Sequence, residues 1–221
     1  MKKCFLSPLF APIMAILLMF VLGLMAVYFR ANGVNTFFDD GYFCDTVTYT
    51  FYFAVFFALL LFFGDFKGKC LTWGVLLFLD IAAILREAGI QHWLTTTDTT
   101  AIKLRFFTNP KNPLSEKIVA GILILIVISA ILYLIIKYAP RIWLGFWKKE
   151  PMYWSICTLC GMGVVSKIAD RFHGNWFKYT GEHLSDEAYF FSIMIEETSE
   201  ASLPLMALIA LMQWHLIKGE K

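Results

Sequence analysis

Long uncharged apolar runs constrain this chain more than any other feature of its sequence. The run from Leu9 to Phe29 has no charged residue, and residues 118–136 are almost entirely Ile, Leu, Val, Ala and Gly. A helix needs about 20 apolar residues to cross the hydrocarbon core of a bilayer. Of the 221 residues 59% are hydrophobic and 16% are charged, against about 25% charged in a typical soluble domain. The sequence therefore predicts an integral membrane protein.

The apolar runs predict an all-α fold, a polytopic transmembrane helix bundle of about six spans. The spans lie at residues 9–29, 47–64, 71–90, 118–136, 152–169 and 188–217, within a single membrane domain that covers residues 1–221. The short loops "GDFKGK" and "KYAPRIWLGFWKKEP", predicted as cytoplasmic turns, are rich in Lys and Arg. The positive-inside rule then predicts cytoplasmic N- and C-termini. The first run is interpreted as an uncleaved anchor.

The segment 91–117 is predicted to be an outer loop with a short helix. Asp98 is a candidate cap for "TTAIKLRFF", in which apolar and basic residues interleave. Such a helix suits the headgroup layer of a membrane, and an amphipathic loop packed on the bundle explains the pattern equally well.

Ionisable residues occur inside three of the predicted spans, although charge is costly in a bilayer. In the sixth span three glutamates interrupt an apolar run. In the third span Asp80, Glu87 and Gln91 share one helical face, and in the fifth span Ser166, Asp170 and His173 do the same. Under the predicted topology the outer ends of these spans point the same way. We therefore expect their acids to converge near the non-cytoplasmic surface.

Acids outnumber cations in this group by six to three, which predicts a polar site rather than complete mutual neutralisation. Predicted catalytic carboxylates are Glu87, Asp170, Glu197 and Glu200. Predicted ligand- or cofactor-binding cations are Arg86, Lys167 and Arg171. Predicted ligands of a divalent metal are His92, His173 and Glu196. A haem held by the two histidines is an alternative cofactor.

Three functions are compatible with such a site. The first is a membrane-embedded enzyme or binding protein that acts on a lipid headgroup or a lipid-linked substrate with a divalent metal. The second is a proton-coupled or cation transporter, supported by Asp80 at mid-span and by Pro204 in the sixth span. The third is a non-catalytic membrane partner or scaffold, held together by interhelical ion pairs such as Arg86–Glu196 or Arg171–Glu200.

Membrane lipids are the expected partners, with a homo-oligomer or another membrane protein as further candidates. Nucleic-acid binding is not expected, because the formal net charge is only +2 and the basic residues form no run. Cys157 and Cys160 form a "CTLC" motif, which we interpret as packing residues because no second cysteine pair or nearby histidine completes a zinc site.

The stretches "LREAGIQHWLT", "KLRFF" and "EETSE" resemble those of small multi-pass inner-membrane proteins of bacteria that carry no assigned role. The likeness covers the chain from the third predicted span onward, and it implies a location in the bacterial inner (cytoplasmic) membrane. It implies no activity and assigns no role to any residue.

Overall fold

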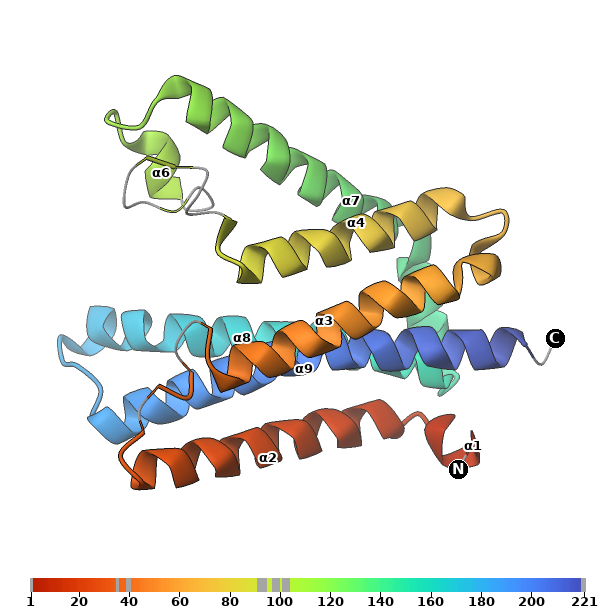
Figure 1. The fold of residues 1–221 in the computed structure, drawn as a ribbon, viewed down its shortest axis with the longest axis horizontal. Coiled ribbons are helices and arrows are strands. Elements are labelled where there is room, and N and C mark those ends of the chain that lie inside the picture. The colour runs from red at the N-terminus through yellow and green to blue at the C-terminus, as the bar shows by residue number, and fades with distance from the viewer. Residues whose placement is uncertain are drawn as a thin grey trace. The chain divides into compact units, whose positions relative to one another are not determined.

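Helices account for the regular structure of the described residues in this computed structural model (Figure 1), and no strand occurs among them. The structure describes residues 2–34, 36–38, 41–90, 95–96, 100 and 104–219. The all-α prediction is confirmed for this part of the chain. Its helices are α1 (Lys2–Phe5), α2 (Phe10–Ala31), α3 (Phe43–Leu61), the 3-10 turn η1 (Phe63–Phe66), α4 (Cys70–Glu87), α6 (Leu104–Thr108), α7 (Leu114–Trp147), α8 (Pro151–Thr180) and α9 (Asp186–Lys218).

Five of these helices, namely α2, α3, α7, α8 and α9, are long and apolar enough to cross a membrane. This supports the prediction of a multi-pass membrane protein. The predicted third span corresponds to α4, which has 18 residues and carries Asp80, Arg86 and Glu87. A count of six spans therefore stays a prediction.

The described chain divides into two compact units, which we describe separately. Unit 1 comprises Met1–Asp65 and Arg141–Lys221, and unit 2 comprises Phe66–Pro140. In unit 1 helix α9 packs against α8, α3 and α2. Small side chains permit this close packing, because Ala26 of α2 and Ala201 of α9 are almost completely buried in one apolar cluster with Cys44 of α3. The single membrane domain over residues 1–221 stays a prediction.

The N- and C-terminal segments lie at the same end of unit 1 (Figure 1). Gln213, which is fully buried on α9, donates a 2.9 Å hydrogen bond from Nε2 to the carbonyl oxygen of Phe5. At this end His215 Nδ1 also lies 2.5 Å from Oδ2 of Asp65.

In unit 2 the short helix α6 packs against α7. Phe106 is fully buried against Ala120, and its carbonyl oxygen accepts a 2.7 Å hydrogen bond from Nδ2 of Asn112. Of the two interpretations of the outer loop, this contact favours a segment packed on a neighbouring helix. The proposed cap, Asp98, lies outside the described residues.

The segment "KYAPRIWLGFWKKEP" is mostly helical and not a turn, because α7 continues through Pro140 to Trp147; the location of its end in the cytoplasm stays a prediction. The apolar run marks what can lie in hydrocarbon, whereas a helix ends only where its backbone hydrogen bonds end. The helix ends at Trp147, and the chain turns at Lys149, which has a left-handed φ of 57°. The turn is then closed by aromatic packing, since the rings of Phe146 and Trp154 stack 4.8 Å apart.

Candidate functional site

The candidate site lies along the interface of α8 and α9 in unit 1. Hydroxyl groups connect the two helices at two levels: Ser192 donates a 3.0 Å hydrogen bond to the carbonyl oxygen of Ala169, and Ser155 donates one of 2.7 Å to Oε1 of Gln213. Ser199 and Ser202 are fully buried in α9 and hydrogen-bond to carbonyl oxygens of their own helix. Small polar residues thus let the helices approach closely without leaving these hydroxyls unsatisfied.

Glu200 is more deeply buried than Asp170: 13% of the Glu200 side chain is exposed, against 41% for Asp170. Its Oε1 accepts a 2.8 Å hydrogen bond from Ser166 Oγ and lies 3.5 Å from Lys167 Nζ. Lys167 Nζ lies 3.3 Å from Oδ2 of Asp170, one turn further along α8. Asp170 and Glu200 therefore share one ammonium group, and the predicted approach of the fifth span to the sixth is present in unit 1.

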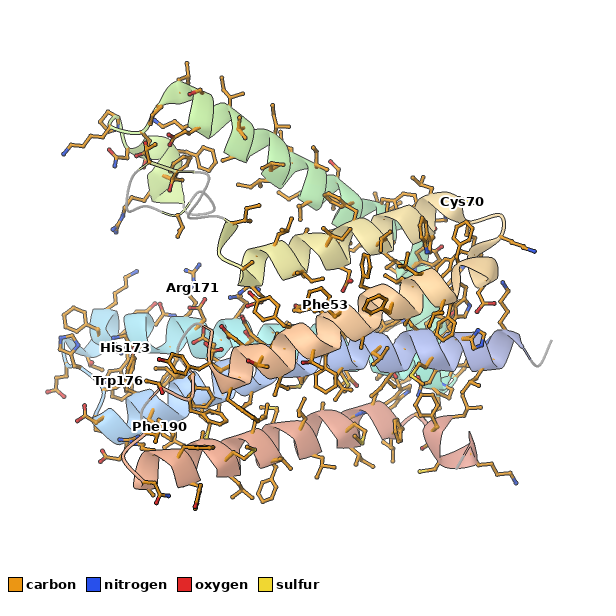
Figure 2. All side chains as sticks on the ribbon, viewed as in Figure 1. Phe53, Cys70, Arg171, His173, Trp176 and Phe190 are labelled. Atoms are coloured by element: carbon orange, nitrogen blue, oxygen red, sulfur yellow. The ribbon has the colours of Figure 1, made fainter. Side chains whose placement is uncertain are left out.

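The ion pair predicted between Arg171 and Glu200 is replaced by Lys167–Glu200. In the part of the chain that the structure describes, no carboxylate lies within 4.0 Å of the Arg171 guanidinium. The two cations share one face of α8 and differ in level: Lys167 directly follows Ser166, which bonds Glu200, whereas Arg171 lies four residues, or about 6 Å, further along the helix. Figure 2 shows Arg171 extending away from the α8–α9 pair.

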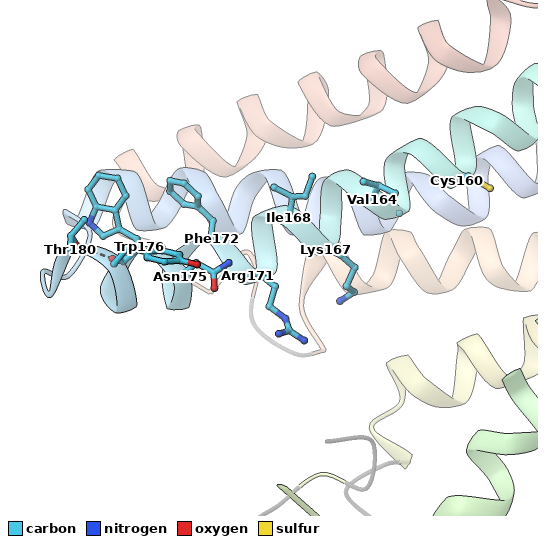
Figure 3. Close-up of a pocket in the computed structure, with 11 residues that line it drawn as sticks. Cys160, Val164, Lys167, Ile168, Arg171, Phe172, Asn175, Trp176 and Thr180 are labelled. Carbon is cyan, nitrogen blue, oxygen red and sulfur yellow. Dashed lines mark hydrogen bonds between the residues drawn. The ribbon is translucent and has the colours of Figure 1, made fainter. Parts of the chain in front are cut away.

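A groove of about 830 Å³ runs along the outer face of α8 and ends in an aromatic region (Figure 3). Lys167 and Arg171 form one side of it, four residues apart, and extend in the same direction. Ile168, Phe172 and Trp176 form a second row at the same spacing. The groove therefore presents two cations beside a continuous apolar and aromatic strip, which is the pattern of a surface that binds an amphiphilic anion.

The other two predicted glutamates, Glu196 and Glu197, lie half-buried on α9, one helical turn before Glu200. The backbone carbonyl of Glu197 faces Sγ of Cys44 on α3 at 3.8 Å. Glu197 thus contacts α3 within unit 1, and it is not among the residues that line the α8 groove.

The predicted residues of the third span belong to unit 2. Arg86 and Glu87 lie 3.7 Å apart at the end of α4. Because the two units are described separately, the convergence of Glu87 with Asp170 and Glu200 stays a prediction.

Of the predicted metal ligands, His92 lies outside the described residues. His173 on α8 is half-buried; its ring packs on Tyr189 at 4.9 Å, and its Nδ1 has no hydrogen-bond partner among the described residues. No group of three or more His, Cys, Asp or Glu side chains in the described ranges is arranged to hold a metal ion. The prediction of a metal site formed with His173 and Glu196 therefore has no support within these ranges.

Several groove residues were not predicted, namely Asn175, Trp176, Tyr179 and Thr180. A signal for two of them is present in the sequence, because Asn175 and Tyr179 follow Arg171 at steps of four residues, the spacing of one helical face. The predicted span ended at residue 169, whereas α8 continues to Thr180, so these positions were assigned to a loop.

Comparison of the chain with protein-family models, curated proteins and solved structures found no match.

Proposed function

We propose that this chain is a multi-pass membrane protein that binds the phosphate group of an anionic lipid, either a phospholipid headgroup or a lipid-linked phosphate, in the groove of α8. The observation that carries the proposal is the exposed guanidinium of Arg171 beside an apolar and aromatic strip. A guanidinium presents a planar set of donors that matches two oxygens of a phosphate, and it stays charged at any physiological pH.

The shape of the groove supports a lipid rather than a soluble anion. Its lining extends from Cys160 to Thr180, and 20 residues of helix correspond to about 30 Å. The part near Cys160 and Val164 is apolar, whereas the part beyond Lys167 carries the cations and Asn175. A phosphate at Arg171 would therefore leave the acyl chains of the same molecule beside the apolar part.

In this proposal Asp170 and Glu200 orient Lys167. Both carboxylates lie within 3.5 Å of its ammonium, so they hold it beside the groove and reduce its net attraction for a second anion. Arg171 is then the principal receptor of the phosphate, and Lys167 is a positioned second cation.

The experiment measures lipid binding to the purified protein in nanodiscs of phosphatidylcholine, titrated with phosphatidylglycerol or with a polyprenyl phosphate. For Arg171→Gln we expect the dissociation constant of the preferred lipid to rise more than about tenfold, since a hydrogen bond to a charged group contributes about 1.5–3 kcal/mol. Lys178→Gln is the matched control, because Lys178 is an exposed cation of α8 outside the groove lining. Equal losses in the two variants would show that binding follows overall charge and not the groove.

We also propose that both termini face the cytoplasm of a bacterial cell, with the chain in the inner membrane. The adjacency of Phe5 and Gln213 supports a common side for the termini, and Lys148, Lys149 and Lys218 lie near the helix ends. The test uses a variant that keeps only the exposed Cys4. A membrane-impermeant maleimide should label it only after the cells are permeabilised, and labelling of intact cells would reverse the orientation.

Proton or cation transport is the second candidate, and Asp80 favours it. This residue is 7% exposed on α4, and its Oδ2 has no hydrogen-bond partner among the described residues. A buried carboxylate in this state needs a proton or a cation to be stable in an apolar environment. Proteoliposomes that carry a pH-sensitive dye test the candidate, because Asp80→Asn should abolish any proton flux that the unmodified protein shows.

A further inference from the structure

A second polar cluster lies within unit 2, where α4 contacts α7. The buried hydroxyl of Thr72 on α4 lies 3.1 Å from the hydroxyl of Tyr133 and 2.9 Å from that of Tyr138, both on α7. Lys137 Nζ donates hydrogen bonds of 3.1 Å to Thr72 Oγ1 and 2.5 Å to the Tyr133 hydroxyl. One ammonium and three hydroxyl groups therefore meet at the same point.

The hydrogen bonds within this cluster do not use all the N–H donors of Lys137. An ammonium has three N–H donors, and two of those of Lys137 are directed to neutral hydroxyls. One donor remains, and the Lys137 side chain is exposed. Within the described residues no carboxylate lies within 4.0 Å of this ammonium, so its positive charge is solvated by hydroxyls but not neutralised.

The charged residues nearest to the cluster in the sequence are mostly basic. Lys67 and Lys69 precede Thr72 and Lys137 lies on α7, whereas the nearest acid of α4 is Asp80, eight residues beyond Thr72. Lys137 follows directly on the apolar run of residues 118–136, which covers about 28 Å of helix. The cluster therefore lies at the depth where the hydrocarbon core ends and lipid phosphates begin.

We propose that Lys137, Tyr133, Tyr138 and Thr72 form a binding site for the phosphate group of an anionic membrane lipid. The remaining N–H of Lys137 supplies the charge-assisted contact. Thr72 accepts from Lys137 and can donate to only one tyrosine, so the other tyrosine donates to Thr72 and one tyrosine O–H is left for the phosphate. This site goes beyond the α8 groove, because it is formed by other helices in the other unit and depends on none of the groove residues.

The test is the acylation of Lys137 by an amine-reactive reagent, measured by mass spectrometry on the full-length protein in nanodiscs. One set of discs contains phosphatidylcholine alone, and the other contains equal parts of phosphatidylcholine and phosphatidylglycerol. Reactivity is expressed relative to Lys148, an exposed lysine at the end of α7, which corrects for the surface potential. We expect phosphatidylglycerol to lower the relative reactivity of Lys137 about fivefold, the effect of one hydrogen bond of about 1 kcal/mol.

Removal of one hydroxyl tests whether the cluster binds the phosphate or whether Lys137 alone contacts the membrane surface. Tyr138→Phe keeps the ring and the ammonium, so a folded variant should lose most of the protection of Lys137 that phosphatidylglycerol provides. Full protection in this variant, or equal reactivity of wild-type Lys137 in the two kinds of disc, would overturn the proposal. Protection of the same size by inorganic phosphate in phosphatidylcholine discs would overturn the assignment to a lipid.

Discussion

The hydroxyl of Ser166 on α8 donates a 2.8 Å hydrogen bond to the carboxylate of Glu200 on α9. Ser166 is almost fully buried, so this bond lies inside the helix pair, whereas the ammonium of Lys167 reaches the same carboxylate from its exposed side. One oxygen of Glu200, Oε1, thus meets both a neutral and a charged donor. This arrangement explains how an acid is accommodated between two apolar helices.

Substitution of the two partners of this bond should have unequal effects on stability. Glu200→Gln keeps an acceptor for Ser166 and removes the charge that attracts Lys167, an ammonium that is 58% exposed, so we expect the free energy of unfolding to fall by less than about 1 kcal/mol. Ser166→Ala removes a donor from an enclosed carboxylate and should cost about 1–3 kcal/mol. The measurement is denaturation in mixed micelles at increasing mole fractions of sodium dodecyl sulfate.

Asp170→Asn is the control for this pair, because 41% of the Asp170 side chain is exposed. Its effect should lie within about 0.5 kcal/mol of zero. If Glu200→Gln instead abolishes folding, the ion pair with Lys167 is needed for the fold. That result would favour the scaffold function over the lipid-binding function.

The geometry of Arg171 predicts that its charge alone is not sufficient for lipid binding. Arg171→Lys keeps the positive charge but replaces a planar fork of donors by a point charge. We expect the affinity for the phosphate-bearing lipid to fall about threefold to tenfold, with a smaller loss than for Arg171→Gln. Unchanged affinity in Arg171→Lys would mean that only electrostatic attraction acts at this position, and a titration at several salt concentrations would confirm it.

Gln213 connects the last span to the first residues of the chain. Gln213→Leu removes the donor to the Phe5 carbonyl and the acceptor of Ser155, so residues 2–9 should become more accessible. Hydrogen–deuterium exchange of this segment should accelerate, and the free energy of unfolding should fall by about 1–3 kcal/mol.

Ser155→Ala is the matched variant for Gln213. It removes the interhelical bond within unit 1 but leaves the Phe5 carbonyl paired. Exchange of residues 2–9 should therefore stay at the wild-type rate. Faster exchange in both variants would show that general loosening of α8 and α9, and not the contact with Phe5, controls the N-terminal segment.

The α7–α8 turn depends on a glycine. A Cβ atom at Gly145 would overlap the ring of Tyr153, and both residues lie in unit 1. Gly145→Ala should therefore lower stability by about 1–3 kcal/mol, because the ring must move out of its packed position. Gly174 is the matched control: it lies in α8 with open space around it, so Gly174→Ala should raise stability by up to about 1 kcal/mol through helix propensity. Thermal unfolding in detergent compares the two variants.

The sequence predicted the helices themselves well, and their ends poorly. The observed α2 (Phe10–Ala31) and α9 (Asp186–Lys218) lie within a few residues of the predicted spans 9–29 and 188–217. The observed α7 (Leu114–Trp147) and α8 (Pro151–Thr180) are 34 and 30 residues long, against the predicted 118–136 and 152–169. Hydropathy marks the part of a helix that prefers hydrocarbon, and polar residues such as Asn175 or Lys178 extend a helix beyond it at no cost.

The sequence predicted which residues lie near the candidate site better than it predicted which of them contact one another. The shared face of Ser166, Asp170 and His173 placed the first two correctly near the α8–α9 interface, but helical spacing does not distinguish Lys167 from Arg171 as the partner of Glu200. The two cations are four residues apart, so they share a helical face and differ mainly in level, by about 6 Å along the helix. The tertiary contacts set this level, since Ser192 bonds the carbonyl of Ala169 and Ser166 bonds Glu200.

The sequence by itself determined that the chain is helical and apolar enough to cross a membrane several times, because backbone hydrogen bonds inside a bilayer can be satisfied within a helix and the apolar runs match its thickness. It also determined which side chains carry charge. The tertiary structure alone decided which charges meet: Glu200 with Ser166 and Lys167, Lys137 with three hydroxyls, and Arg171 with no described carboxylate. The physical reason is that pairing depends on the rotation and relative shift of packed helices, which small buried residues set over the whole interface.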